Sequence, residues 1–256
     1  MAGPGVFLET LTWPEAEAQF RMGRVVLVPI GALAKEHGHH LPLNTDWLVA
    51  RALAERVAAQ LPVVVAPVVG FGYYPAFVNY PGSQHLKADT FMALMRDLIA
   101  NLIDHGVTRI AVLNGGVSTE APLAIVLREV LERRGVRVAA AHIRELGRKG
   151  HALLQQRLGG HADEAETSIL LALQPEAVRL HLAVEDYGGE AAAPATVFRR
   201  PVTFSGKPDS GIDFSRTGAH GDPSLATAAK GEALLAEMTH ELIEGLRSLW
   251  PEAMTV

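Results

Sequence analysis

The chain has 256 residues, of which 48% are apolar, and carries a formal net charge of -5 with a sequence pI of about 6.1. This length and apolar share suffice for one large domain, and the charge excludes a general attraction to nucleic acid or to anionic membranes. The absence of cysteine excludes disulfides, thiolate metal sites and cysteine nucleophiles. No apolar run reaches ~20 residues and no basic stretch precedes an apolar core at the N-terminus, so we expect no transmembrane helix, no signal peptide and a cytoplasmic protein.

The first part of the chain alternates between two kinds of pattern. Continuous β-branched runs are typical of strands buried on both faces, and apolar residues at helical spacing are typical of amphipathic helices. Thr12 and Glu15 have the spacing of a capping box at the start of the first helix. Helices are predicted at 12–23, 47–60, 89–105 and 122–134, and strands at 24–30, 62–69, 108–114 and 136–141. This order predicts an α/β fold with a mainly parallel sheet and helices on both faces.

The second part of the chain is less regular. A helix is predicted at 164–173, a loop-rich region at 187–221, and a last helix at 223–249 with Asp222 as its N-cap. The long loop 70–87 contains Tyr73, Tyr74, Phe77 and Tyr80, which predict a pocket wall or a subunit contact. No internal repeat or linker is found, so residues 1–256 are expected to form a single domain.

The loop from Lys35 to Asp46 concentrates groups that can perform chemistry. It follows a predicted buried strand and holds one lysine, one glutamate, three histidines and one aspartate. In an open α/β sheet, loops at the carboxyl ends of the strands meet and form the site. Two later segments hold further polar groups: Asn114-Gly115-Gly116, and His161 with Asp163, Glu164 and Glu166. Imidazoles and carboxylates suit zinc, manganese or iron(II), so a divalent metal site is predicted, although each group alone is also explained as polar surface or a helix cap.

Four segments resemble the creatininase (creatinine amidohydrolase) family. They are Pro29 to Asp46 with its Glu36-His-Gly-His-His core, Tyr80-Pro-Gly-Ser83, Gly160-His-Ala-Asp-Glu-Ala-Glu-Thr-Ser168, and Gly221 to Gly231. They occur in the family's order, and the resemblance runs from about residue 5 to residue 245. It implies a three-layer α/β/α fold, a metal-dependent hydrolase of an amide or cyclic amide, and a homohexamer.

The resemblance also assigns roles by position. His37 matches the family's metal-binding histidine, Asp46 its bridging aspartate, and Glu166 the glutamate that binds the same metal as that histidine. His161 matches the histidine that works as acid or base near the substrate. Ser83, Asn114, Gly115 and Gly116 are expected to contact substrate, because glycine lets backbone N–H groups approach closely.

Several positions depart from the family pattern. Lys35 stands where the family has a glutamate that binds a second metal, and Gly116 and Ser118 replace further groups of that second site. We therefore expect one ion per chain, zinc first, with iron or manganese as alternatives. Glu36 would reach the metal if the loop's additional residue forms a bulge, and His85 is a weaker candidate for a replacement ligand. The Lys35 ammonium would replace the missing ion's charge and stabilise an oxyanion, unless it points to solvent.

The predicted reaction is hydrolysis of an amide or cyclic amide in a small molecule by a metal-activated water, with His161 moving the proton. The tryptophans that line the creatinine pocket in the family have no counterpart near His161 or Val117, so creatinine is not the expected substrate. Two alternatives remain: a metal-dependent hydrolase of lactones or sugar derivatives, and a non-catalytic binding member of the family.

Overall fold

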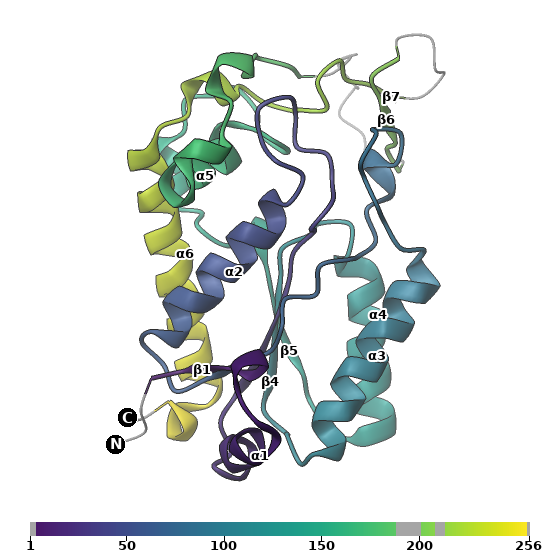
Figure 1. The fold of residues 1–256 in the computed structure, drawn as a ribbon, viewed down its shortest axis with the longest axis vertical. Coiled ribbons are helices and arrows are strands. Elements are labelled where there is room, and N and C mark those ends of the chain that lie inside the picture. The colour runs from purple at the N-terminus through teal and green to yellow at the C-terminus, as the bar shows by residue number, and fades with distance from the viewer. Residues whose placement is uncertain (1–3, 188–200, 208–212, 255–256) are drawn as a thin grey trace.

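A parallel five-stranded sheet lies between two layers of helices (Figure 1). The structure is a computed structural model that describes residues 4–187, 201–207 and 213–254. The strands lie in the order β1 (Val6–Phe7), β3 (Val64–Val65), β2 (Val26–Ile30), β4 (Ile110–Asn114) and β5 (Ala139–His142). Each neighbouring pair is parallel, so the predicted α/β fold with a parallel sheet is confirmed.

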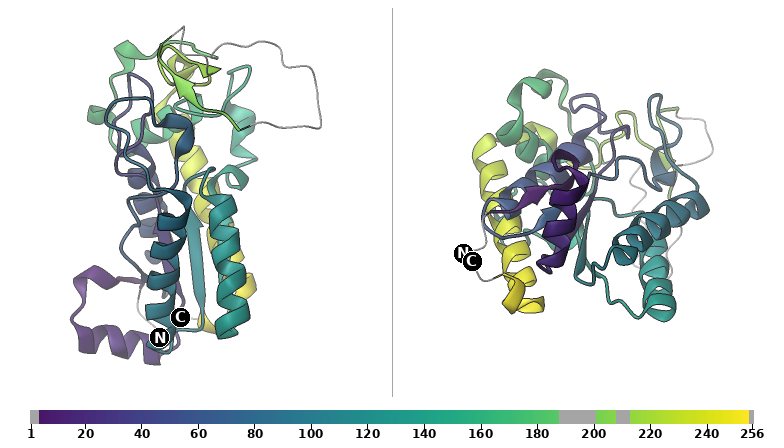
Figure 2. Two further views of the ribbon diagram at one scale, coloured as in Figure 1. Left: turned by 90° about the vertical axis from the view of Figure 1, so that its right-hand side faces the viewer. Right: turned by 60° about the horizontal axis from the view of Figure 1, so that its bottom comes forward.

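The two faces of the sheet bury separate apolar cores. Val26, Val28 and Ile30 pack on one face with α3 (Ala88–Asp104) and α4 (Glu120–Arg134). Leu27 faces the opposite way, because side chains alternate along a strand. It packs with the second helical layer, which consists of α2 (Thr45–Ala58), α5 (Glu164–Leu173) and α6 (Ala228–Leu249). Figure 2 shows the two helical layers from two further sides.

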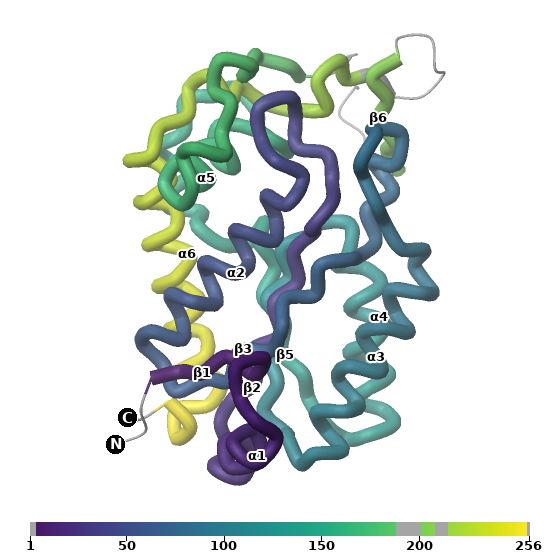
Figure 3. The backbone as a smooth tube through the Cα atoms, in the orientation of Figure 1, coloured from purple at the N-terminus to yellow at the C-terminus, as the bar shows by residue number. Residues whose placement is uncertain are grey.

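The carboxyl ends of the strands all point to one end of the molecule. There the chain after β2 rises well above the sheet before it turns back into α2 (Figure 3). The short pair β6 (Phe204–Ser205) and β7 (Asp213–Phe214) lies at the same end. Helix α1 (Trp13–Arg21) and the two termini lie at the opposite end. The fold therefore delivers the loop 31–44 and the start of α5 to one region, as predicted for an α/β site.

The structure corrects two predicted elements and adds a third that was not predicted. The last helix begins at Ala228 instead of residue 223, because Asp222 caps a separate 3-10 turn (Pro223–Leu225) and Thr227 caps α6. The strand predicted at 62–69 is regular only at Val64–Val65, since Pro67 has no N–H to donate. Strand β1 was not predicted, being two residues long, and part of the predicted loop 187–221 lies outside the described residues. None of the described helices is long and apolar enough to cross a membrane.

Helix α6 crosses α5 so closely that Gly231 is required at the contact. A Cβ at Gly231 would lie 1.8 Å from the carbonyl oxygen of Ser168. We expect Gly231→Ala to lower the free energy of unfolding by about 2 kcal/mol or more, because the helices must separate. Gly245 lies in the same helix with no atom within 4 Å of its added Cβ. Gly245→Ala is the matched control and should raise stability by roughly 0.5–1 kcal/mol. Thermal unfolding measures both, and equal effects of the two substitutions would contradict this account.

Candidate active site

Hydrogen bonds from its backbone N–H groups hold the loop between β2 and α2 in a defined shape. The N–H of Lys35 donates to the carbonyl of Leu43 at 3.0 Å, and the N–H of Glu36 donates to Ser83 Oγ at 3.0 Å. Gly38 has φ +69°, a conformation that glycine adopts readily, and its N–H donates to the Glu36 carboxylate. This turn directs the side chains of Lys35, Glu36 and His37 into the protein, where all three are buried.

His37 is oriented by two oxygen atoms. Its Nδ1 lies 2.9 Å from the carbonyl oxygen of Lys35, and its Nε2 lies 2.7 Å from Asp46 Oδ1. A carbonyl only accepts hydrogen bonds, so Nδ1 carries a hydrogen. The Nε2 lone pair of the neutral ring then faces a carboxylate oxygen, which is repulsive unless a proton or a cation lies between them. Metal-binding imidazoles are commonly oriented in this way, by donating their other N–H to a backbone carbonyl.

His161 shows the same kind of orientation. Its Nε2 lies 2.8 Å from the carbonyl oxygen of Glu36 and 3.0 Å from Glu36 Oε2, so this nitrogen donates. Its Nδ1 remains unprotonated in the neutral ring and lies 3.7 Å from Glu166 Oε2. The ring of Phe77 packs on the imidazole with centroids 4.1 Å apart. His37, His161 and Glu166 each offer a ligand atom, and these three atoms lie within 4.8 Å of one another.

The start of α5 positions Glu166. The Asp163 side chain caps the helix by accepting from the N–H groups of Ala165 and Glu166 at 2.9 and 3.0 Å. Ala162 has φ +46°, an unfavourable conformation for a residue with a Cβ, and its N–H donates to Glu166 Oε2 at 2.6 Å. Desolvation of the half-buried side chain raises the pKa of Glu166 to about 6, and the Asp46 carboxylate adds to this effect while His161 and Lys35 oppose it. The backbone strain at Ala162 therefore accompanies the placement of this carboxylate.

Lys35 forms a buried ion pair with Asp46. Its Nζ lies 2.6 Å from Asp46 Oδ2, with the side chains 9% and 6% exposed. The rings of Tyr74 and Phe77 lie 5.6 and 5.4 Å from Nζ, within reach of cation–π attraction. Burial acts to lower the pKa of Lys35, but the carboxylates of Asp46, Glu166 and Glu36 raise it above its ordinary value. Burial acts to raise the pKa of Asp46, but Lys35 and His37 hold it well below its ordinary value. The alternative in which Lys35 points to solvent is wrong.

The other predicted site residues lie nearby in different roles. The side chain of Asn114 is occupied in shaping its own loop, donating to the carbonyl of Gly116 at 2.8 Å and accepting from Thr119 Oγ1 at 2.5 Å. Gly115 packs so tightly on β2 that an added Cβ would lie 2.6 Å from the carbonyl oxygen of Ile30. Ser83 orients Glu36 through the contact given above, and His85 is exposed beside Tyr73. Within the described chain, the group of possible ligands contains His161, which was predicted as an acid or base, and does not contain Asp46, Glu36 or His85.

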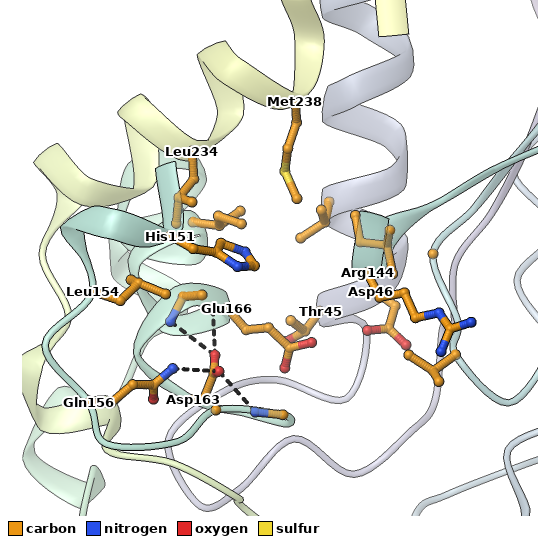
Figure 4. A pocket seen from close by; sticks show the side chains of 18 of the residues that line it. Thr45, Asp46, Arg144, His151, Leu154, Gln156, Asp163, Glu166, Leu234 and Met238 are labelled. Atoms are coloured by element: carbon orange, nitrogen blue, oxygen red, sulfur yellow. Dashed lines mark hydrogen bonds between the residues drawn. The ribbon is translucent and has the colours of Figure 1, made fainter. Parts of the chain in front are cut away.

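A cavity of about 560 Å³ opens beside Asp46 and Glu166 (Figure 4). Its walls come from α2, α5 with the preceding Asp163, α6, residues 143–160 and the turn after β4, and include Leu154, Leu234 and Met238. Figure 4 also shows His151 and Arg144 at its sides. The sequence does not predict this cavity, because its apolar walls come from segments far apart in the chain, although Asp46, Gly115 and Glu166 of the predicted polar segments also line it. The available signal was Leu234 and Met238, which lie four residues apart and hence on one face of the last helix.

His40 lies behind the cluster and gives a test of its burial. Its Nε2 lies 2.8 Å from Thr167 Oγ1, and burial together with the charge on His37 lowers the pKa of His40 from 6.5 to about 4. The unfolded chain takes up this proton near pH 6.5 and the folded chain near pH 4, so stability present above pH 6.5 is lost as the pH falls between these values.

We expect the wild type to lose about 3 kcal/mol more than His40→Gln between pH 7 and pH 4, at roughly 1.4 kcal/mol per pKa unit. Urea unfolding at the two pH values measures this difference. His85→Gln removes an exposed histidine and should leave the wild-type pH dependence unchanged. Parallel behaviour of the wild type and His40→Gln would contradict the burial of a neutral His40.

A family model described as creatinine amidohydrolase matches residues 9–246. The chain belongs to the creatininase family. A creatinine amidohydrolase of Pseudomonas putida is 30% identical over 96% of this chain and 98% of its own length. The mycofactocin precursor peptide peptidase of Mycolicibacterium smegmatis is also 30% identical, over 89% of this chain and 86% of its own. A solved creatininase mutant of the Zn-Zn type is 26% identical and aligns with a TM-score of 0.79 over 97% of this chain and all of that one.

These similarities confirm the expected creatininase-like fold and the expected enzyme class. As a creatininase-family member, the chain is a metal-dependent hydrolase that acts on an amide bond. Family membership does not make creatinine its substrate, since relatives of equal identity are named for different substrates. The similarities do not fix the particular ion, the number of ions or the residues that hold them, which depend on the side chains of this chain's own site.

Proposed function

We propose that this chain is a hydrolase of an amide or cyclic amide other than creatinine, and that it works with one divalent ion per chain. The observation that carries the proposal is the orientation of His37 and His161. Each ring donates a hydrogen bond from one nitrogen to a backbone carbonyl. The other nitrogen faces a carboxylate, that of Asp46 for His37 and that of Glu166 for His161. This donor set of imidazole nitrogen and carboxylate oxygen fits zinc, with iron and manganese as alternatives.

We infer that His37, Asp46 and Glu166 hold the ion, as their family positions imply. A cation between His37 Nε2 and Asp46 Oδ1 would relieve their repulsive contact. His161 Nδ1 would then be free to take the proton of the attacking water and return it to the leaving nitrogen. Glu36 keeps His161 in the required tautomer by accepting from its Nε2. A divalent ion bound here would lower the pKa of a water and polarise the amide carbonyl.

Lys35 supports the proposed count of one ion. Its ammonium lies against Asp46, which matches by position the aspartate that bridges two metals in the binuclear relatives, so a positive charge already occupies that side of the carboxylate. Gly116 offers no ligand side chain where those relatives have a histidine. The same ammonium, held by Asp46 in a buried site, is suited to stabilise the negative charge that develops on the amide oxygen.

The test combines metal content with turnover. Purified protein should bind close to one ion per chain, and His37→Ala should lose it. His161→Ala should keep the ion and lose activity on a panel of linear amides and lactams, whereas loss of the ion would make His161 a ligand. A parallel panel of lactones separates C–N from C–O cleavage. A fully folded wild type without affinity for zinc, iron or manganese would refute the proposal.

We further propose that residues 1–256 form one domain and that the protein is a cytoplasmic homohexamer, as the family resemblance implies. The chain mass of 27.4 kDa gives a particle of about six times this mass. Light scattering coupled to size exclusion measures it, and a monomer at micromolar concentration would contradict the hexamer.

A further inference from the structure

The cavity beside the candidate metal site is lined by a group of apolar side chains together with several polar ones, among them Asp46, Glu166 and His151. Val49 of α2, Ile169 of α5, and Leu234 and Met238 of α6 line it, and Leu154 completes the wall from the connecting segment. Figure 4 shows Leu154, Leu234 and Met238 in this wall. All except Leu154 belong to the buried core between the sheet and these helices. Asp46 and Glu166, two of the three proposed metal ligands, line the same cavity, so the apolar walls and the proposed metal site border one space.

The two arginines that line the cavity already have partners, and His151 is the third basic side chain of the lining. Arg144 pairs with Glu120 at 2.7 Å, and the guanidinium of Arg157 lies 4.5 Å from the Tyr187 ring centroid. A substrate that carries a carboxylate would have to compete with Glu120 for Arg144. The volume of about 560 Å³ lies within the range of ~300–1,000 Å³ that is typical of small-molecule sites. The space therefore suits an uncharged group with substantial apolar surface.

We propose that this cavity binds an aliphatic or aromatic group of the amide substrate, next to the bond that is cleaved. The position of that bond rests on the proposed function, whereas the apolar chemistry of the bound group rests on the residues that line the cavity. Apolar surface transferred from water to such walls contributes binding energy in proportion to its area. The substrate class is thus an amide with a bulky apolar substituent, such as an N-acyl amine or a peptide with an apolar side chain.

The proposal is tested by binding, independently of turnover. The chain has six methionines, and the methyl groups of all six can be labelled with carbon-13 for NMR. Met238→Leu identifies the Met238 signal by its disappearance. Titration with hexanamide is expected to shift this signal, with a Kd at least roughly tenfold lower than that of acetamide, because hexanamide buries four additional methylenes.

Two neighbouring leucines provide a matched pair of variants. Leu154 lines the cavity, whereas Leu153 does not and is 48% exposed. Leu154→Trp narrows the cavity and should abolish the hexanamide shift, while Leu153→Trp should retain it. Equal binding of the two amides, no shift with hexanamide, or equal loss in both tryptophan variants would overturn the proposal. Because this readout needs neither metal nor catalysis, its failure is distinguishable from failure of the proposed function.

Discussion

Glu166→Gln is expected to abolish metal binding and activity in a chain that remains folded. The glutamine keeps an oxygen that can accept from the Ala162 N–H, as Glu166 Oε2 does at 2.6 Å. It removes the negative charge from a side chain that is 33% exposed and in contact with His161. Since a bound ion supplies several kcal/mol of transition-state stabilisation, kcat/KM should fall at least ~10³-fold. Isothermal titration with zinc and an amide-hydrolysis assay measure the two losses.

Glu164, two residues earlier in the same helical turn, is the matched control. Its side chain is 0% exposed, accepts from the N–H groups of Gln155 and Gln156, and pairs with Lys230 Nζ at 2.5 Å. Glu164→Gln removes the negative charge beside the largely buried Lys230 ammonium, which keeps the neutral acceptors Gln155 Oε1 and the Leu225 carbonyl, and should cost about 3 kcal/mol of stability. It should keep the ion. If both variants lost metal binding and stability together, the division into a structural and a metal-binding glutamate would be wrong.

The sequence predicted the framework of the site because the framework depends on local patterns. Continuous apolar runs identify β2 and β4, and parallel strands bring the residues after them to the same end of the sheet. The loop after Ile30 and the turn after Asn114 therefore had to lie close together. The capping role of Asp163 also follows from local sequence, because a carboxylate before a helix accepts from its first free N–H groups.

Local sequence patterns could not predict which side chains of the site contact one another. Whether Lys35 faces Asp46 or solvent depends on how the loop returns from the turn at Gly38, and this choice sets the charge of the site. The contact between Glu36 and His161 joins residues 125 positions apart. The start of α6 was misplaced for a related reason, because Asp222 followed by proline suits a 3-10 turn as well as a helix.

Lys35→Met is also expected to have a large effect, and the first quantity it should change is stability. The substitution keeps much of the side-chain volume between Tyr74 and Phe77 and removes the charge that neutralises Asp46. A buried carboxylate without its cation costs roughly 3–5 kcal/mol, so metal-free Lys35→Met should unfold at markedly lower urea concentration than the wild type. Lys149→Met is the control, because that side chain is 84% exposed and an exposed ion pair is worth at most about 1 kcal/mol.

If the Lys35 ammonium holds the place of a second cation, added zinc should stabilise Lys35→Met more than it stabilises the wild type. A ligand that binds the folded state raises its stability in proportion to the logarithm of ligand concentration over Kd. In the variant no ammonium competes for Asp46, so added zinc should raise its thermal midpoint by more than it raises that of the wild type. The variant should bind up to two ions per chain. Activity should still fall ~10²–10³-fold, since the oxyanion loses its charged donor. A variant as stable as the wild type without metal would show that Lys35 does not neutralise Asp46.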